Sequence, residues 1–257
     1  MLIPLPLSRG SSRKRVDFLI TGVQKAGTTA LHAALSDHPD IRMAKKKEVH
    51  FFDKAPPLGL RAVDFRFYHN AFDWRGMRRE TRVGEATPAY IWWPGALARI
   101  KAYNPEMQII VVLRDPVERA WSQHWMDVSL GRKSEDFLES IETELAQDGK
   151  TPDRVHSMLS RGLYHDQLTA LYALFEKENV LILRYEDLAN DWAETYAAIS
   201  GFLGIRSVTL PRLPQIHRTP NKPEIPQTIR DSLIPFFQED CEAMRDLLGW
   251  DKGSWCV

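Results

Sequence analysis

A glycine-rich loop near the N-terminus carries residues suited to binding an anion. The loop contains, in order, Gly22, Lys25, Gly27, Thr28 and Thr29. It lies between an apolar run and a helical pattern, where backbone N–H groups and the helix dipole can hold a negatively charged group. Thr28 stands where a Walker A loop has its lysine, and Lys25 lies inside the turn, which suits a shorter chain of anionic groups. A tight turn without a ligand would need the glycines but neither the lysine nor the threonines.

A carboxylate and an imidazole are spaced for proton transfer further along the chain. If the segment is extended, Glu48, His50 and Phe52 fall on one face, because side chains alternate along a strand. The carboxylate and the imidazole could then take a proton from a hydroxyl group. Alternatively, Glu48 only neutralises the lysines at 45–47 and His50 packs as an ordinary half-buried histidine. The residues by themselves favour this plainer alternative.

Arg114 and Ser122 are candidates for a second anion site. Arg114 follows an apolar run, and Ser122 comes about two turns into the helix expected after it. Together they could hold a phosphate, with two parallel hydrogen bonds from the guanidinium. The residues between them have a structural explanation, since Asp115, Pro116 and Glu118 form a regular helix start. The alternative for Arg114 is an ion pair with a neighbouring carboxylate.

The elements that must position these groups predict an α/β fold. Short apolar runs predict buried strands at 16–23, 108–113 and 180–183. Periodic patterns predict helices at 28–38, 94–103, 116–130, 134–147, 161–177 and 226–248. Strands that alternate with helices indicate a central parallel sheet covered by helices on both faces. Ligands bind beyond the carboxyl ends of such strands, where the glycine-rich loop and Arg114 are expected.

The composition indicates one globular domain. The chain has 257 residues, with 34 basic and 34 acidic side chains, so neither nucleic acid nor an anionic membrane is an expected partner. No apolar run is long enough to span a membrane. We expect a disordered tail at 1–15 and a single domain at 16–257. Cys241 and Cys256 suggest neither a disulfide framework nor a zinc site, which favours a reducing compartment and a cytoplasmic protein.

Several short motifs occur together in a specific order. After the glycine-rich loop come Glu-Val-His-Phe-Phe (48–52), Thr-Pro-Ala-Tyr (87–90), Leu-Arg-Asp-Pro (113–116), Arg-Gly-Leu-Tyr (161–164) and Arg-Tyr-Glu-Asp-Leu (184–188). This combination resembles the sulfotransferases that use 3'-phosphoadenosine-5'-phosphosulfate (PAPS), in particular the heparan sulfate 3-O- and N-sulfotransferase branch and its bacterial relatives. The resemblance covers about 16–203 and implies a single-domain, P-loop-like sulfotransferase fold with PAPS as co-substrate and no metal.

The resemblance also implies roles for the matching residues. Glu48 would be the general base, with His50 beside it, and Lys25 would stabilise the charge that develops as the S–O bond of the donor breaks. The donor would be bound by Lys25, Ala26, Gly27, Thr28, Thr29, Arg114, Ser122 and Tyr164, with Arg114 and Ser122 on its 3'-phosphate. The acceptor would be bound by Glu48, His50, Phe51, Thr87, Pro88 and Trp92.

Departures from the family pattern bear on the acceptor. Ala86 stands where the heparan sulfate 3-O enzymes have a lysine, and their cysteine-bridged C-terminal loop has no counterpart. Lys222 and Arg218 are candidates for closing the donor site. We therefore expect a hydroxyl or amine of a small molecule, lipid or carbohydrate rather than a long sulfated polysaccharide. Two alternatives stay open: a P-loop small-molecule kinase using ATP and Mg²⁺, and a non-catalytic nucleotide-binding relative.

Overall fold

A five-stranded parallel sheet forms the centre of the molecule, in the strand order β2-β3-β1-β4-β5. The computed structural model describes residues 14–54, 65–146, 153, 157–209, 213, 222–251 and 255. Its strands are β1 (Phe18–Gly22), β2 (Ile41–Met43), β3 (Arg82–Ala86), β4 (Gln108–Leu113) and β5 (Val180–Arg184). Most of the tail expected at 1–15 lies outside the described residues.

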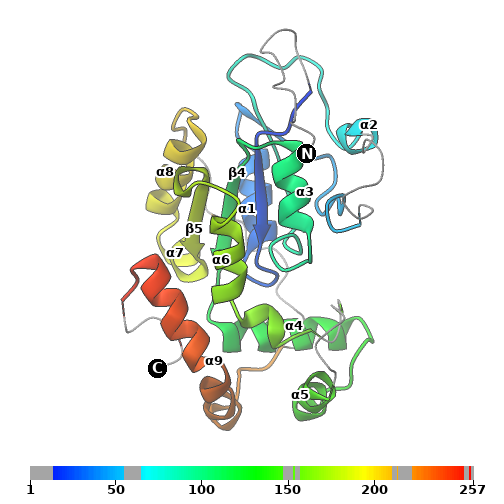
Figure 1. Ribbon diagram of the computed structural model, residues 1–257, viewed down its shortest axis with the longest axis vertical. Coiled ribbons are helices and arrows are strands. Elements are labelled where there is room, and N and C mark those ends of the chain that lie inside the picture. Colours follow the sequence, from blue (N-terminus) through cyan, green and yellow to red (C-terminus); the bar gives the residue numbers. More distant parts are fainter. Residues whose placement is uncertain are drawn as a thin grey trace, which may run out of the picture.

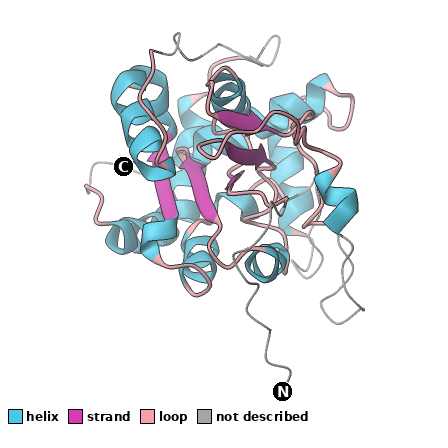
Figure 2. Cartoon of the chain, turned by 90° about the horizontal axis from the view of Figure 1, so that it is seen from above, coloured by secondary structure: helices cyan, strands magenta, loops and turns pink. Residues whose placement is uncertain are grey.

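Helices pack against both faces of the sheet (Figures 1 and 2). They are α1 (Thr28–Ser36), α2 (Phe65–His69), α3 (Ala96–Tyr103), α4 (Pro116–Ser129), α5 (Phe137–Leu145), α6 (His165–Tyr172), α7 (Tyr185–Asn190), α8 (Trp192–Leu203) and α9 (Gln227–Leu248), with 3₁₀ turns η1 (Ser160–Gly162) and η2 (Lys177–Asn179). In Figure 1, α4 lies below the strands, beyond the carboxyl end of β4, and α9 lies beside it. The predicted α/β class is therefore confirmed.

The adjacent strands β1 and β4 are buried, and they consist mostly of apolar residues. Every residue of β1 is buried, as are all residues of β4 after Gln108. The turn from β4 into α4 forms as its residues predict: Asp115 caps the helix by accepting the N–H of Glu118 at 2.8 Å, and Pro116 takes the first helical position. This helix start fixes where Arg114, the last residue before the cap, can place its side chain.

Two expectations about local structure were wrong, and two strands were missed. The strands β2 and β3 were not predicted, because β2 has three residues and β3 contains Arg82, Gly84 and Glu85. The helix expected at 161–177 is shorter, with the 3₁₀ turn η1 preceding the eight residues of α6. The segment 48–52 is not a strand, because Glu48 and His50 adopt left-handed backbone conformations.

The expectation about the cysteines was also wrong. Cys241, on a buried face of α9, is disulfide-bonded. Cys256, the other cysteine of the sequence, lies outside the described residues. The cysteines therefore give no support for a reducing compartment, and the cytoplasmic location stays a prediction.

Candidate functional site

The glycine-rich loop connects β1 to α1 and leads directly into the first N–H groups of that helix. Gly27 has a φ of 79° and is followed by Thr28, the first residue of α1. A Cβ atom on Gly27 would lie 3.1 Å from the ring of Tyr185, so both the backbone angle and the space require glycine. Ala26 and Thr28 are buried and Thr29 is half-buried. The backbone N–H groups at the start of α1 are thus available to a phosphate at this loop.

Arg114 reaches this loop directly. Its Nη1 donates to the carbonyl oxygen of Lys25 at 3.1 Å, and its guanidinium lies 4.6 Å from the centre of the Tyr185 ring. Tyr164 is buried, and its hydroxyl donates to the carbonyl oxygen of Arg114 at 2.8 Å. Tyr164 thus positions Arg114 through its backbone, while a direct contact between Tyr164 and the donor stays a prediction. The structure therefore brings together the two elements that the sequence suggested separately as candidates for binding anions.

The surroundings of Lys25 lower the pKa of its ammonium to about 8. Burial is the main cause, and the positive charge of Arg114 adds to it. Two cations held this close repel each other in the absence of an anion. An anionic ligand between them would relieve this repulsion and strengthen the binding of a proton by Lys25.

Ser122 lies on α4 eight positions after Arg114, with Glu118 halfway between them. Positions separated by four residues share one side of a helix, so Glu118 and Ser122 face the same way. Arg114 precedes the capping residue of α4, and its ion pair with Glu118 brings its side chain to that side. Ser122 is 7% exposed. Its joint action with Arg114 on a phosphate stays a prediction, and the structure adds the nearby carboxylate of Glu118, which forms an ion pair with Arg114 at 3.3 Å.

Glu48 and His50 do lie side by side, although the extended segment expected to bring them together is absent. His50 Nε2 is 3.3 Å from Glu48 Oε2, and His50 Nδ1 is 2.7 Å from Asp53 Oδ2. The imidazole is therefore held between two carboxylates. The pKa of Glu48 is lowered to about 2, mainly by the hydrogen bond from His50. Burial opposes this shift, whereas Lys47, whose Nζ lies 2.5 Å from Glu48 Oε1, strengthens it. Glu48 is thus ionised at neutral pH.

A buried hydrogen-bond network supports the segment that carries Glu48 and His50. Glu85 is fully buried at the end of β3 and accepts hydrogen bonds from the hydroxyls of Tyr68, Thr87 and Tyr90 at 2.9–3.0 Å. Tyr90 in turn accepts the backbone N–H of Phe51 at 3.0 Å. The backbone N–H of Glu48 donates to Ala86 at 2.9 Å. Since β3 pairs with β1, these contacts place the Glu48 segment beside the strand that ends in the glycine-rich loop.

The residues expected to contact the acceptor are held in different ways. Thr87 is buried, with its hydroxyl on Glu85, and Phe51 stacks on Tyr68 at 4.8 Å between ring centres. Trp92 lies against the guanidinium of Arg161, at 4.5 Å from its ring centre, and Arg161 donates to Gln24 in the glycine-rich loop.

Pro88 also adjoins this loop. Its carbonyl oxygen would be 3.8 Å from a Cβ atom placed on Gly22. The structure thus brings Trp92 and Pro88 to the loop. The contacts of Phe51, Thr87, Pro88 and Trp92 with an acceptor stay predictions.

Sequence reasoning missed several residues of this region. Tyr185 packs against both Gly27 and Arg114, and the signal for it was its place directly after β5, at the ligand-binding edge of the sheet. Glu85 gave no signal, because a glutamate in a short strand looks like a surface residue. Asp53 was visible three positions after His50, but only the turn of the chain shows that they pair.

The fold and the site together define an α/β protein with a glycine-rich loop after the first strand, an arginine after β4 that contacts this loop, and a carboxylate–imidazole pair beside β3. The chain belongs to the sulfotransferase family, since the family described as "Sulfotransferase domain" matches residues 15–212. The resemblance seen in the motifs is thereby confirmed. Among the described residues, no helix is long and apolar enough to cross a membrane.

Individual relatives agree with this family. Heparan sulfate glucosamine 3-O-sulfotransferase 6 of Homo sapiens is 34% identical over 211 residues, which cover 79% of this chain and 57% of the relative. Heparan sulfate glucosamine 3-O-sulfotransferase 3B1 of Mus musculus is 32% identical over 214 residues, which cover 80% of this chain and 51% of the relative. The chain thus spans little more than half the length of these relatives. A sulfotransferase from Alicyclobacillus acidocaldarius is similar in structure, with a TM-score of 0.80, 29% identity and coverage of 93% of this chain and 98% of that one.

Proposed function

We propose that this protein transfers a sulfuryl group from PAPS to a hydroxyl or amine of a small-molecule, lipid or carbohydrate acceptor. One observation carries the proposal. Among the described residues other than glycine, positive φ angles occur at Lys25 (72°), Glu48 (63°), His50 (54°) and Trp255 (56°). Such angles are unfavourable for these residue types and tend to persist at functional sites. Three of these four residues are the proposed catalytic groups.

The proposed reaction is an in-line transfer. The Glu48 carboxylate takes the proton of the acceptor as the acceptor oxygen or nitrogen forms a bond to sulfur. The bond between sulfur and the oxygen of the 5'-phosphate breaks, and that oxygen keeps the electron pair. Lys25 and the loop N–H groups stabilise its charge, so that adenosine 3',5'-bisphosphate leaves. In this scheme Arg114 and Ser122 hold the 3'-phosphate.

His50 and Lys47 would adjust the basicity of Glu48. Asp53 holds the imidazole of His50 at 2.7 Å, and His50 in turn contacts Glu48 at 3.3 Å. An acceptor that displaces the Lys47 ammonium from Glu48 removes one of the causes of its low pKa. The carboxylate then becomes a stronger base when the acceptor is in place.

The decisive experiment replaces Glu48 by glutamine. We expect Glu48→Gln to lose at least about 100-fold in turnover, a typical contribution of general base catalysis, while it binds adenosine 3',5'-bisphosphate as well as the wild type does. Transfer of radiolabelled sulfate from PAPS to a panel of acceptors measures turnover, and calorimetry measures binding. Glu106→Gln, an exposed position, is the matched control. Near-normal turnover of Glu48→Gln would show that another group is the base.

A thermal-stability comparison of ligands, together with the acceptor panel, separates the alternatives. A kinase would be stabilised against heat by ATP with Mg²⁺ more than by adenosine 3',5'-bisphosphate, and the family match does not favour it. A non-catalytic relative would bind adenosine 3',5'-bisphosphate but transfer no label to any acceptor. No group of three potential ligand side chains able to hold a metal ion occurs within the described part of the chain. Independence of metal stays a prediction that chelation would test.

A further inference from the structure

Glu118 is a carboxylate in an unusual place for a phosphate site. It lies on α4 between Arg114 and Ser122, the two residues proposed to hold the 3'-phosphate of the donor. A negative charge at this position repels a phosphate and competes with it for Arg114, whose Nη2 is 3.3 Å from Glu118 Oε2. Either Glu118 weakens donor binding, or another group neutralises it.

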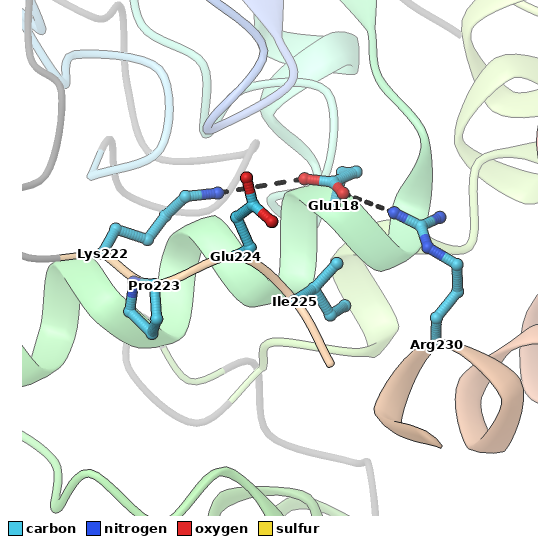
Figure 3. Close-up of a pocket in the computed structure, with 6 residues that line it drawn as sticks. All are labelled: Glu118, Lys222, Pro223, Glu224, Ile225 and Arg230. Atoms are coloured by element: carbon cyan, nitrogen blue, oxygen red, sulfur yellow. Dashed lines mark hydrogen bonds and ion pairs between the residues drawn. The ribbon is translucent and has the colours of Figure 1, made fainter. Parts of the chain in front are cut away.

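Two further cations surround the same carboxylate. The guanidinium of Arg230, in the first turn of α9, donates to Glu118 Oε1, and the ammonium of Lys222 is 3.8 Å from Glu118 Oε2. Figure 3 shows the carboxylate between these two side chains, with Lys222 on one side and Arg230 on the other. Arg114, Lys222 and Arg230 therefore share one anion, and each is at least 70% buried.

Arg230 is placed by packing as well as by charge. Its Nη1 lies 3.7 Å from the capping carboxylate of Asp115. The helix that carries it packs on α4 through a core that includes Val117, Trp121 and Phe237. Arg230 is thus fixed against the first turn of α4. Next to Lys222, the chain is attached to α4 by a hydrogen bond from Trp121 Nε1 to the carbonyl oxygen of Pro223 at 2.9 Å.

The space beside this cluster is open. A cavity of about 430 Å³ is lined by Glu118, Lys222, Pro223, Glu224, Ile225 and Arg230 (Figure 3). Lys222 faces this cavity. Its positive charge contributes to the lowered pKa of Lys25, and the charge of Arg114 contributes to a lowered pKa of Lys222 itself. The cluster therefore adjoins the donor loop. A phosphate entering the cavity would meet Lys222 and Arg230 together with the carboxylates of Glu118 and Glu224. Arg114 reaches the same cluster through its ion pair with Glu118.

We propose that Arg230 is a positioning residue for the donor: it neutralises Glu118, so that Arg114 and Lys222 are left to a phosphate. Arg230 acts through Glu118 and needs no contact with the donor. The inference rests on the proposed function, because it requires a ligand with a 3'-phosphate. It makes the start of α9 part of the donor site, and it predicts that the charge of Arg230 is needed only while the charge of Glu118 is present.

A double-mutant cycle tests this dependence. Calorimetry measures the binding of adenosine 3',5'-bisphosphate and of adenosine 5'-monophosphate to the wild type, Arg230→Gln, Glu118→Gln and the double variant. We expect Arg230→Gln to weaken binding of the bisphosphate about tenfold and of the monophosphate less than about twofold, as for a charge that acts on one anionic group. The double variant should bind the bisphosphate within about threefold of the wild type. Arg75→Gln, which also leaves a carboxylate without its arginine but on an exposed surface, is the control.

The outcomes distinguish the two proposals. Equal weakening for both ligands, or no recovery in the double variant, would overturn the role of Arg230 as a neutralising group. An unchanged affinity of Arg230→Gln for the bisphosphate would do the same. A wild-type protein that fails to bind the bisphosphate at all would overturn the proposed function, and this inference with it. Thermal unfolding of each variant shows whether the fold is retained, and Glu118→Gln should bind the bisphosphate at least as well as the wild type.

Discussion

The hydroxyl of Tyr90 lies 2.9 Å from Oε1 of Glu85, and the same hydroxyl accepts the backbone N–H of Phe51 at 3.0 Å. Because Glu85 in its ionised form only accepts hydrogen bonds, Tyr90 donates to it and turns its oxygen toward Phe51. The buried end of β3 thereby holds the segment of Glu48 and His50. Without these contacts, nothing in the sequence of that segment would favour two left-handed residues.

Tyr90→Phe tests this support. The change removes one hydroxyl and leaves both the Glu85 carboxylate and the Phe51 N–H without this partner, so we expect unfolding to become easier by about 1–3 kcal/mol. We also expect kcat to fall about tenfold. This factor corresponds to a rise of about 1.4 kcal/mol in the activation free energy when the base is less well positioned. Affinity for adenosine 3',5'-bisphosphate should stay unchanged. Tyr172→Phe, in α6, is the control, and an equal loss of turnover there would refute the assignment.

Glu85 should make the stability of the fold depend on pH. Burial raises its pKa to about 7, from 4.5 in the unfolded chain, although hydrogen bonds from Tyr90, Tyr68 and Thr87 oppose the shift. The folded state then binds the proton more tightly, so this contribution to stability is complete below about pH 4.5 and is lost as pH rises through 7. Between pH 5 and pH 8, the free energy of unfolding measured with urea should fall more for the wild type than for Glu85→Gln. Parallel curves for the two proteins would contradict the raised pKa.

Lys25 should make donor binding sensitive to alkali. Burial and the charge of Arg114 lower its pKa to about 8, so its ammonium loses the proton as pH rises through that value. We expect the affinity for adenosine 3',5'-bisphosphate to fall above about pH 8. Lys25→Gln should bind more weakly at pH 7 and show a flatter profile, whereas Lys46→Gln, at an exposed position, should follow the wild type. A wild-type affinity that is constant from pH 7 to 9.5 would argue against a role of the Lys25 charge.

His50 should set the acid limit of the reaction. Its hydrogen bond is the main cause that lowers the pKa of Glu48 to about 2, so His50→Ala should raise that pKa toward its ordinary value. The acid limb of kcat/KM should then move to higher pH, because the base is lost to protonation earlier as pH falls. Lys47→Met should shift the limb in the same direction by less, since Lys47 is a smaller cause. Rate measurements from pH 4 to 7 check both: the wild type should show no limb from Glu48 in this range, and a His50→Ala profile that is equally flat would argue against Glu48 as the base.

Gly84→Ala tests the packing between β3 and β1. A Cβ atom at this position would lie 2.2 Å from Cζ of Phe18, which is fully buried. Since neither strand can move without losing its pairing, we expect a destabilisation of about 1–3 kcal/mol, as for other overpacked cores. The midpoint of thermal unfolding measures it. Gly76→Ala is a poor control because of its positive φ, whereas Gly201, with open space around it, should tolerate alanine.

Much of the fold could be predicted because its central elements are locally determined. The boundaries of β4 and the start of α4 follow from an apolar run, a capping aspartate and a proline, each of which acts over a few residues. The strands β2 and β3 could not be predicted, because β2 is too short for a pattern. Strand β3 contains Glu85, which is tolerated in the core only because three hydroxyls reach it.

The candidate site likewise combines residues that could be predicted from the sequence with contacts that could not. The amino-acid sequence by itself determined the glycine-rich loop with Lys25 and the presence of Glu48 and His50, because their residue types and spacing suit anion binding and proton transfer. Only the tertiary structure decided that Arg114 contacts the loop, that His50 is held between Glu48 and Asp53, and that Arg230 meets Glu118 across 112 positions of chain. Contacts between distant segments depend on how strands are ordered and helices packed, and no local pattern encodes that order.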